Sequence, residues 1–551
     1  MMDYTKSKSE INMIKGANSH AITGGAHINP GNESFRVIRN GIYVDKTGLI
    51  DLINNTIDTK DKLTCISRPR RFGKSYTAQM LCAYYDKGCD SGELFSDLEI
   101  ANKASFRRYL NAFNVIYLDI TSFISAADSV DNIVNDIKNT LRRELQAEFS
   151  VSGEESTISE LLLNICSVLG SKFFFVIDEW DALFREFKDN VAIQEQYINL
   201  LREIFKNSGV TDRIVAGAFM TGILPIKKYG HQSAISDFRE YSMIQPSLFA
   251  EYVGFTKKDI ASLEKNYTIN KSALQKWYDG YRFPSVGEVY NPNSVCQAIR
   301  TQTYDTYWSK TETYEALLEY INLDSNGLQA DIIQMLGGNE MPVDTATFQN
   351  DMTSVQSRDD VLSLLIHLGY LAYDSSSCKT RIPNEEIRRE FISSVRSESH
   401  KVTNKIIRNS DQLIVDTIEG NQEAVARAIE EAHDAGTFGI SPLFYNDEQA
   451  LRSVVKFAYI SCLNDYLKIE ELPAGKGYAD VVYLPKKHSS LPALLIELKS
   501  GQSAEGAIIQ IHNRNYPKVL ENSGYEVILC GINYDPKTKK HSCIIEKMKM
   551  E

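Results

Sequence analysis

The tripeptide Gly73-Lys74-Ser75 has the residue types of a phosphate-binding loop. It stands between the apolar run "LTCIS" and a helical pattern, a position in which backbone N–H groups at a helix start point toward a phosphate. Lys74 would then reach the β- and γ-phosphates of a nucleotide, and the Ser75 hydroxyl would bind Mg²⁺. Arg68, however, replaces the first glycine of the usual G-x-x-x-x-G-K-[ST] pattern, so the tripeptide alone is a weak signal.

A second signal is the apolar run "FFFVIDEW", which ends in two adjacent carboxylates. We expect Asp178 to hold Mg²⁺ through water and Glu179 to orient or activate the attacking water. The alternative is a strand that ends in solvated acids. Thr221, which ends the run "RIVAGAFMT", either senses the γ-phosphate or caps a turn before Gly222. Loop and acids occur in the order that a site hydrolysing ATP requires.

Arg70 and Arg71 place two cations inside the loop, where they would add charge at the triphosphate. The alternative is packing or ion pairing with neighbouring acids. We predict ATP and Mg²⁺ as cofactors, with Lys74 and Glu179 in catalysis and Ser75 and Asp178 as metal ligands. The predicted nucleotide contacts are Arg70, Arg71, Phe72, Gly73, Lys74, Ser75, Tyr76, Asp178 and Thr221.

A separate set of chemical residues lies near the C-terminus, in "GYADVVYL" followed by "ALLIELKS". Glu497 and Lys499 are two apart on one expected strand, so they project from the same face. With Asp480 they form an Asp…Glu-x-Lys set in which Asp480 and Glu497 bind Mg²⁺, which activates water, and Lys499 neutralises developing charge. The alternative is a half-exposed hairpin edge. Catalytic roles are predicted for all three.

Strand-like runs alternate with helical patterns between residues 35 and 255. Strands are expected at 62–67, 113–120, 172–179 and 213–223, with helices at 74–88, 131–145 and 194–205 between them. This alternation is typical of an α/β fold with a mostly parallel sheet covered by helices. Residues 1–34 are polar and rich in Gly, Asn and Ser, which indicates a flexible tail.

Residues 256–410 are richer in helical patterns. Within them, 364–395 predicts helix, strand, turn, strand and helix, with Asn384 as an N-cap, as in a helical or winged-helix-like module. Residues 411–551 predict a third, α/β unit: a helix at 446–467, strands at 477–484 and 493–499, a helix at 503–524 and a strand at 525–532.

Composition sets wider limits on the function. The 551 residues are 43% hydrophobic and 24% charged, as in ordinary globular proteins. A net charge of −12 argues against nonspecific coating of nucleic acid or anionic membrane, although one domain can still be locally basic. Nine scattered cysteines favour a reducing compartment, and we expect a cytoplasmic protein. The longest apolar run is too short for the roughly 20 residues of a membrane span.

The order of motifs resembles the AAA-ATPase-like family of predicted ATPases that carry a C-terminal PD-(D/E)XK nuclease-like domain. The motifs are "YVDKTGLI", "SRPRRFGKS", "VIDEWD", "MTGILPI", "WYDGYRF", "VYNPNSV", "LGYLAY" and "IPNEEIR". In that family the loop usually reads R-P-R-R-F-G-K-S, so the missing glycine is normal there. The resemblance implies nucleotide roles for Lys74, Ser75, Asp178 and Glu179, and a further matching acid at Asp181.

The C-terminal residues resemble the restriction-endonuclease-like PD-(D/E)XK superfamily. The resemblance adds Gln510 and Tyr516 as residues that often accompany such a site, and Glu448 is either another acid of the site or a solvated helix residue. The leading hypothesis is therefore an ATPase coupled to a Mg²⁺-dependent nuclease acting on DNA or RNA. The second is a nucleotide-regulated switch or scaffold whose C-terminal fold only binds nucleic acid or protein. A homo-oligomer is compatible with either hypothesis.

Overall fold

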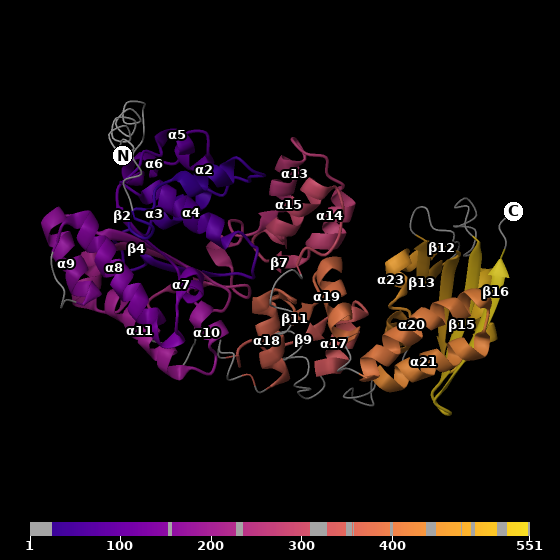
Figure 1. Cartoon of the computed structure of the whole chain (residues 1–551). Helices are drawn as coiled ribbons and strands as arrows, with labels where there is room; N and C mark the ends of the chain where they lie inside the picture. The colour runs from indigo at the N-terminus through magenta and orange to yellow at the C-terminus, as the bar shows by residue number, and fades with distance from the viewer. Residues whose placement is uncertain are drawn as a thin grey trace, which may run out of the picture.

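The computed structural model describes eleven stretches of the chain, separated by short gaps. They are residues 25–151, 157–226, 235–308, 328–348, 355, 357–396, 401–436, 448–474, 477–485, 491–514 and 526–548. Figure 1 shows the elements in three groups that follow one another in chain order, with the helical middle group between two sheet-containing groups. The expected domain limits at 255 and 410 stay predictions, and helix α20 (Lys401–Glu419) runs across the second. The expected flexible tail at 1–34 is wrong for residues 25–34, because Ile28 is buried against β2 (Asn114–Asp119) through a bridge to Ile116 and Glu33 begins α2 (Glu33–Arg39). Residues 1–24 lie outside the described residues.

The first group contains a parallel five-stranded sheet in the order β2-β3-β4-β1-β5. Its strands are β1 (Leu63–Ser67), β2 (Asn114–Asp119), β3 (Phe173–Asp178), β4 (Val215–Gly222) and β5 (Arg239–Tyr241). The first four are the strands predicted from the apolar runs. The three-residue β5 was missed because it is too short and too polar to give a strand pattern.

Helices cover both faces of this sheet, which explains the continuously apolar strands. They include α4 (Lys74–Tyr85), α8 (Ile133–Phe149), α9 (Ile158–Leu169) and α11 (Val191–Phe205). In β3, Phe174 and Val176 enter one hydrophobic cluster, while Phe173, Phe175 and Ile177 enter the other. Because all pairs are parallel, the carboxyl ends of β1, β3 and β4 lie at the same edge, and β4 separates the other two.

The middle group begins with the small sheet β6-β8-β7 and its helices. The elements are β6 (Phe255–Thr256), α13 (Lys257–Leu263), α14 (Lys271–Tyr278), β7 (Tyr281–Phe283), β8 (Gly287–Tyr290) and α15 (Pro292–Thr301). A second part contains α17 (Leu328–Leu336), β9 (Met341–Pro342), α18 (Arg358–Leu368), β10 (Ala372–Asp374), β11 (Lys379–Arg381) and α19 (Glu385–Arg396). The predicted helix, hairpin and helix are confirmed, and the Asn384 side chain accepts from Ile387 N at 3.0 Å as the expected cap.

The C-terminal group is built on the mixed sheet β12-β13-β14-β15-β16, in which only β14 and β15 pair in parallel. Its strands are β12 (Tyr466–Ala474), β13 (Gly477–Pro485), β14 (Ala493–Ser500), β15 (Val527–Asp535) and β16 (Lys540–Met548). The helices α21 (Gln422–Gly436), α22 (Glu448–Ala458), α23 (Cys462–Asp465) and α24 (Ala504–Asn513) accompany α20. The fold class is therefore α/β in both sheet-containing groups, as predicted.

The predicted single helix at 446–467 is wrong. Helix α22 ends at Ala458, α23 is a single turn, and Tyr466 already begins β12. Tyr466 is buried and Leu467 is exposed, which is the alternation of a strand, and β13 supplies the backbone partners. The helix expected at 503–524 is observed as α24, and its remainder from 515 lies outside the described residues.

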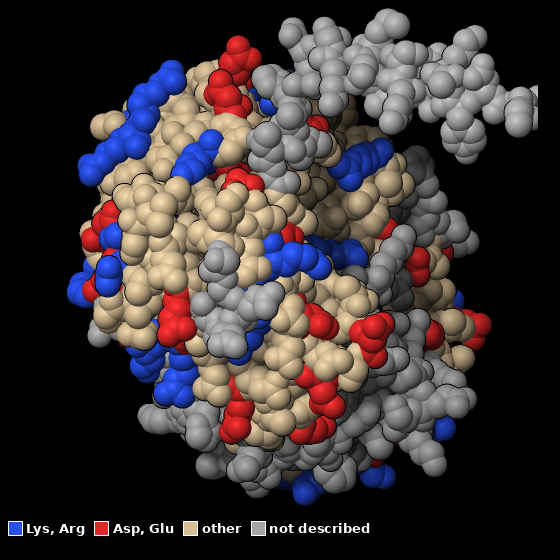
Figure 2. All heavy atoms as spheres, turned by 60° about the vertical axis from the view of Figure 1, so that its left-hand side comes forward, with Lys and Arg blue, Asp and Glu red and all other residues tan. Residues whose placement is uncertain are grey.

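One hydrophobic cluster continues through all three groups. It includes Phe35 near the first sheet, Leu336 at the end of α17, Val455 on α22 and Ile528 on β15. The face in Figure 2 carries Lys and Arg interspersed with Asp and Glu, without a broad patch of one sign. Among the described residues, no helix combines the length and the apolar character needed to cross a membrane.

Candidate nucleotide and nuclease sites

The segment between β1 and α4 forms a phosphate-loop turn without its first glycine. Gly73 has φ 91°, and no atom lies within 4 Å of a Cβ added there, so the left-handed backbone rather than crowding requires glycine. Helix α4 begins directly at Lys74. The start of a twelve-residue helix thus faces the edge at which β1, β3 and β4 end.

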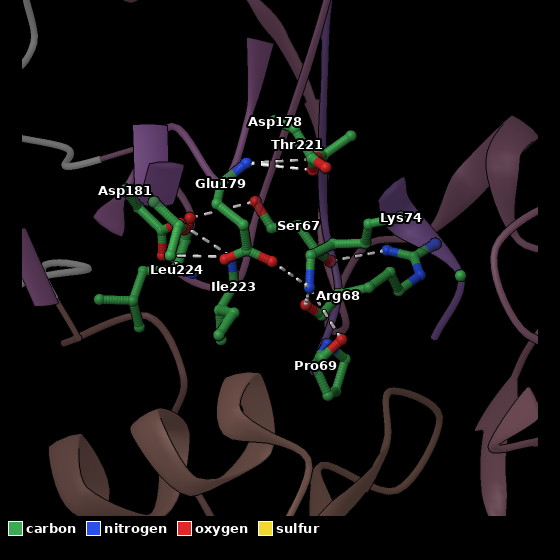
Figure 3. Close-up of polar contacts among 12 residues, drawn as sticks. Ser67, Arg68, Pro69, Lys74, Asp178, Glu179, Asp181, Thr221, Ile223 and Leu224 are labelled. Carbon is green, nitrogen blue, oxygen red and sulfur yellow. Dashed lines mark hydrogen bonds and ion pairs between the residues drawn. The ribbon is translucent and has the colours of Figure 1, made fainter. Parts of the chain in front are cut away.

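Lys74 is buried and fully hydrogen-bonded at this edge. Its Nζ donates to the carbonyl oxygens of Arg68 at 3.1 Å and Pro69 at 3.0 Å. The third partner is Glu179, with Nζ and Oε1 3.1 Å apart. The Lys74 ammonium therefore links the loop after β1 to the acid after β3, as Figure 3 shows.

Asp178 meets two hydroxyls at the end of β3. Thr221 Oγ1 donates to its Oδ1, and the Ser75 side chain also bonds the carboxylate. Burial raises the pKa of Asp178, although both hydroxyl bonds oppose the shift. The structure thus brings together Ser75, Asp178 and Thr221, and a set of hydroxyl and carboxylate oxygens is what Mg²⁺ prefers.

Glu179 sits in a left-handed backbone conformation with φ 50°. Burial disfavours its charge, but Lys74 and the Arg185 guanidinium outweigh burial and lower its pKa. Arg185 Nη2 lies 2.6 Å from Oε2, opposite the oxygen that Lys74 contacts. Arg185, on α10 (Ala182–Glu186), was missed from the sequence. The one signal was its spacing of four from Asp181 on a helix.

Asp181 has a positional role that the sequence did not reveal. Its carboxylate accepts the backbone N–H groups of Ile223 at 3.1 Å and Leu224 at 2.8 Å, and Arg185 Nε at 3.0 Å. Figure 3 shows Asp181 beside Ile223 and Leu224, on the side of Glu179 away from Lys74. Asp181 therefore fixes the turn after β4, next to Thr221.

Three loop residues, Arg68, Pro69 and Arg71, contact the middle group. Arg68 is fully buried, stacks 5.1 Å from the Phe283 ring, and donates to the Tyr241 carbonyl at 2.9 Å; burial lowers its pKa to about 9. Arg71, with φ 68°, donates to the Tyr307 carbonyl. A Cβ added to Gly369, which follows α18, would lie 2.7 Å from Pro69 Cβ.

These contacts favour the packing alternative for Arg71. The Arg70 charge is one of those that lower the pKa of Glu179. Both arginines line a cavity of about 500 Å³ together with Phe72, Gly73, Lys74, Ser75, Tyr76, Glu179 and Arg185. The roles predicted for the loop residues stay predictions.

The cavity lining also includes apolar side chains, among them Ile38, Ile42, Val44, Tyr252 and Phe255. The cavity has the volume of a small-molecule site. Its cations suit phosphates, and its aromatic and aliphatic side chains suit a planar base.

The C-terminal candidates meet where β13 and β14 pair. The ladder ends at Val481 and Ile496, and Asp480 and Glu497 are the next residues on each strand. Leu498 N donates to Asp480 Oδ2 at 2.9 Å, and Lys499 Nζ lies 3.4 Å from Glu497 Oε1. All three side chains are buried and β14 lies between two strands, so the hairpin-edge alternative is wrong.

Of the two C-terminal acids, Glu497 is the one whose negative charge is less fully balanced by its neighbours. Burial and the Asp480 charge raise its pKa to about 7, against the influence of Lys499. Gln510 on α24 donates to Oε1, whereas Oε2 is buried without a hydrogen-bond partner among the described residues. A buried carboxylate oxygen without a partner, beside a second carboxylate, fits a hard divalent cation.

Asp480 is held by a residue that the sequence did not indicate. Arg452 on α22 places Nη2 2.5 Å from Asp480 Oδ1. Glu448 begins the same helix, but its side chain and Tyr516 lie outside the described residues. No group of three or more His, Cys, Asp or Glu side chains positioned for a metal occurs in the described part of the chain.

The strand order, with β4 between β1 and β3 and a loop leading into α4, defines a P-loop nucleotide-binding fold, followed by a second α/β domain. Residues 30–231 match the family model of predicted AAA-ATPases, and residues 446–543 match that of the PD-(D/E)XK nuclease superfamily. The two matched regions have the architecture that the motifs resemble, a predicted AAA-ATPase region followed by a PD-(D/E)XK superfamily region.

Solved structures give only distant similarities. The Aeropyrum pernix ORC2 protein, solved as ADPNP–ADP complexes, is 10% identical over 65% of this chain and 96% of its own, with a TM-score of 0.31. The ORC1 protein of the same organism, solved in complex with DNA, is 12% identical over 61% and 87%, with a TM-score of 0.23. Scores this low do not establish a common overall fold. No curated protein matches the chain.

Proposed function

We propose that the protein binds and hydrolyses ATP in the cavity beside α4. The observation that carries this proposal is the convergence of Lys74, Ser75, Asp178, Glu179 and Thr221 at one edge of the sheet, next to about 500 Å³ of space. Ser75 and Asp178 would hold Mg²⁺, which neutralises charge on the phosphates when bound. Lys74 contacts the phosphates, and Glu179 orients the attacking water. The apolar side chains that line the cavity receive the base.

The first test is Lys74→Ala. We expect ATP hydrolysis to disappear, because Lys74 is the buried lysine of the loop and lines the cavity. Without it, the loop has no ammonium group to contact the phosphates. Lys87, exposed beyond the end of α4, offers a matched Lys→Ala control that keeps full turnover. Undiminished hydrolysis in Lys74→Ala contradicts the assignment.

We further propose that the C-terminal site cleaves phosphodiester bonds of DNA or RNA with Mg²⁺. Asp480 and Glu497 would hold the ion, which supplies an activated water. Lys499 stabilises the negative charge that develops on the phosphate. Incubation with DNA and RNA, with Mg²⁺ or Mn²⁺, should give cleavage that is lost in Asp480→Ala. Cleavage that survives this change points to another site or a contaminant.

A second candidate function is a nucleotide-regulated switch whose C-terminal domain binds nucleic acid or protein without turnover. The observation that favours it is the Arg452–Asp480 pair, since Arg452 occupies an oxygen that a metal needs. Nucleic acid binding by the full chain, measured in EDTA and in Mg²⁺, separates the two. Binding without cleavage in every metal tested supports the switch.

The two sites would be coupled through the loop contacts with the middle group. Arg71 reaches the Tyr307 carbonyl, Tyr307 N donates to Glu386 Oε1 at 2.7 Å, and Ser294 Oγ donates to the same carboxylate at 2.9 Å. A shift of the loop on ATP binding would therefore reach α15 and α19 together.

This coupling predicts a selective effect of Glu386→Gln. The rate of ATP hydrolysis should stay near that of the parent, while the change in cleavage or nucleic acid binding on adding ATP becomes smaller. Glu423→Gln, at an exposed glutamate of α21, is the matched control. An unaltered ATP response in Glu386→Gln excludes this route.

A further inference from the structure

Lys74 has no N–H group left for a phosphate in the observed arrangement. An ammonium group has three donors. Here the three are directed at the carbonyl oxygens of Arg68 and Pro69 and at Glu179, at 3.1, 3.0 and 3.1 Å. Any contact between Lys74 and a nucleotide phosphate must therefore replace one of these bonds.

The bond to Glu179 is the one that a phosphate replaces most easily. The two carbonyl oxygens belong to the loop itself and move with Lys74, whereas Glu179 belongs to the end of β3 and is an anion that competes with phosphate for the same cation. Once Lys74 turns to the phosphates, Glu179 needs another group to hold it in place.

Arg185 is placed to be that group. Its Nη2 lies 2.6 Å from Glu179 Oε2, its side chain is 9% exposed, and it lines the cavity. Its Nε is bonded at 3.0 Å to Asp181, which is fixed by the backbone of Ile223 and Leu224. The anchor of Arg185 is thus the end of β4 and does not depend on the phosphate loop.

We propose that Arg185 is a positioning residue for ATP hydrolysis: it holds the Glu179 carboxylate toward the cavity while Lys74 contacts the phosphates. The inference rests on the proposed function, since it assigns Glu179 the role of orienting water. The planar guanidinium can bond Asp181 and Glu179 at once through different nitrogens, which a lysine cannot do with the same geometry.

The test is Arg185→Gln in the full chain. We expect kcat for ATP hydrolysis to fall by about 100-fold, the cost of misplacing a catalytic group by roughly 1 Å, while KM changes by less than about threefold. Arg185→Lys should recover part of kcat because it keeps the charge. Arg213→Gln, at an exposed arginine of α12 (Ser208–Ile214), is the control expected to match the parent.

A double-mutant cycle separates positioning from a general structural effect. If Arg185 acts through Glu179, then Arg185→Gln has little further effect on the residual rate of Glu179→Gln. Parental kcat in Arg185→Gln, an equal loss of nucleotide binding and kcat, or full additivity with Glu179→Gln each overturns the proposal. Parental turnover in Glu179→Gln itself instead refutes the role of Glu179 in the proposed function. Should Arg185→Gln melt well below the parent, the cycle is run with Arg185→Lys.

Discussion

The nucleotide site and the nuclease-like site use the same residue types but balance their charges in opposite ways. In each, a lysine lies close to a buried glutamate, at 3.1 Å for Lys74 and Glu179 and 3.4 Å for Lys499 and Glu497. Glu179 has a second cation, Arg185, and its pKa is lowered. Glu497 has the Asp480 charge instead, and its pKa is raised to about 7.

This difference shows what each site is ready to receive. The first has cations around its acid, so a polyphosphate entering it meets positive charge. In the second, burial and the nearby Asp480 charge raise the pKa of Glu497 despite Lys499, so a metal ion entering it relieves repulsion and burial together. The same residue types would therefore suit an anionic ligand in one region and a cationic ligand in the other.

The largest effect should come from removing the Glu179 charge. We expect Glu179→Gln to lower the rate of ATP hydrolysis by about 1,000-fold, as for other general bases. Nucleotide binding should stay or strengthen, because Lys74 loses a competing anion. Single-turnover hydrolysis and binding of a non-hydrolysable analogue measure the two quantities. Weaker binding in Glu179→Gln would contradict the proposed charge balance.

The next effect concerns acid stability of the C-terminal group. His541 Nε2 lies 2.9 Å from His433 Nδ1, near the Tyr534 ring, and its backbone N–H donates to Glu430. Burial and His433 lower the pKa of His541 to about 3. Between about pH 6.5 and 3, the unfolded chain binds a proton at His541 that the folded chain does not bind. The free energy of unfolding therefore falls as pH falls through this window.

Between pH 6.5 and 5, protonation of His541 in the unfolded chain should lower the free energy of unfolding by about 2 kcal/mol. Denaturant unfolding at several pH values measures the loss. His541→Gln removes the titrating ring and should flatten the pH dependence by about that amount. An identical slope in the parent and the variant would assign acid sensitivity to other groups.

A smaller effect is expected from freeing Asp480. Arg452→Ala removes a cation that competes with metal for the carboxylate, and we expect Mg²⁺ to bind about tenfold more tightly, or about 1.4 kcal/mol. Thermal shift against Mg²⁺ concentration follows the change. Arg427→Ala, at an exposed arginine of α21, should match the parent. Weaker Mg²⁺ binding in Arg452→Ala would make Arg452 a supporting residue of the metal site.

The smallest effect is expected at Arg68. Its Nε and Nη2 have no hydrogen-bond partner among the described residues, and its charge is fully buried. Replacing a buried charge by an apolar side chain of similar size is often neutral or stabilising, so Arg68→Met should change the free energy of unfolding by no more than about 1 kcal/mol. Chemical denaturation measures this. A loss of several kcal/mol would mean that the bonds of Arg68 to the carbonyl oxygens of Ser67 and Tyr241 outweigh the cost of burial.

The parallel sheet and its chemical edge were predictable because their signals are local. Apolar runs followed by Lys74, Asp178 and Thr221 indicate which strand ends must meet. Among the strands that were missed, β5 is short and polar, and β12 follows a helical pattern without a break. Both segments become strands because of their pairing partners in the folded chain, which no local sequence pattern shows.

The partners of the charged residues were not predictable. Arg452 meets Asp480 only through the folded chain, and Arg71 reaches Tyr307 across a long separation in sequence. Arg185 lies only six residues from Glu179, but no local pattern indicated that these two side chains pair. Asp181 could be recognised as an acid near the site, but its bonds to the backbone after β4 depend on the strand order. Spacing along the chain identifies the groups, and topology identifies their contacts.

The hydrophobic cluster that continues from Phe35 to Ile528 bears on how the protein can be dissected. Separating the C-terminal sheet from the rest would expose apolar faces of α17 and α22 that now cover one another. Scanning calorimetry of the intact chain should accordingly show strongly overlapping transitions rather than well-separated ones. The heat capacity recorded during unfolding, rather than a catalytic rate, is then the most direct measure of how strongly the two sites are coupled.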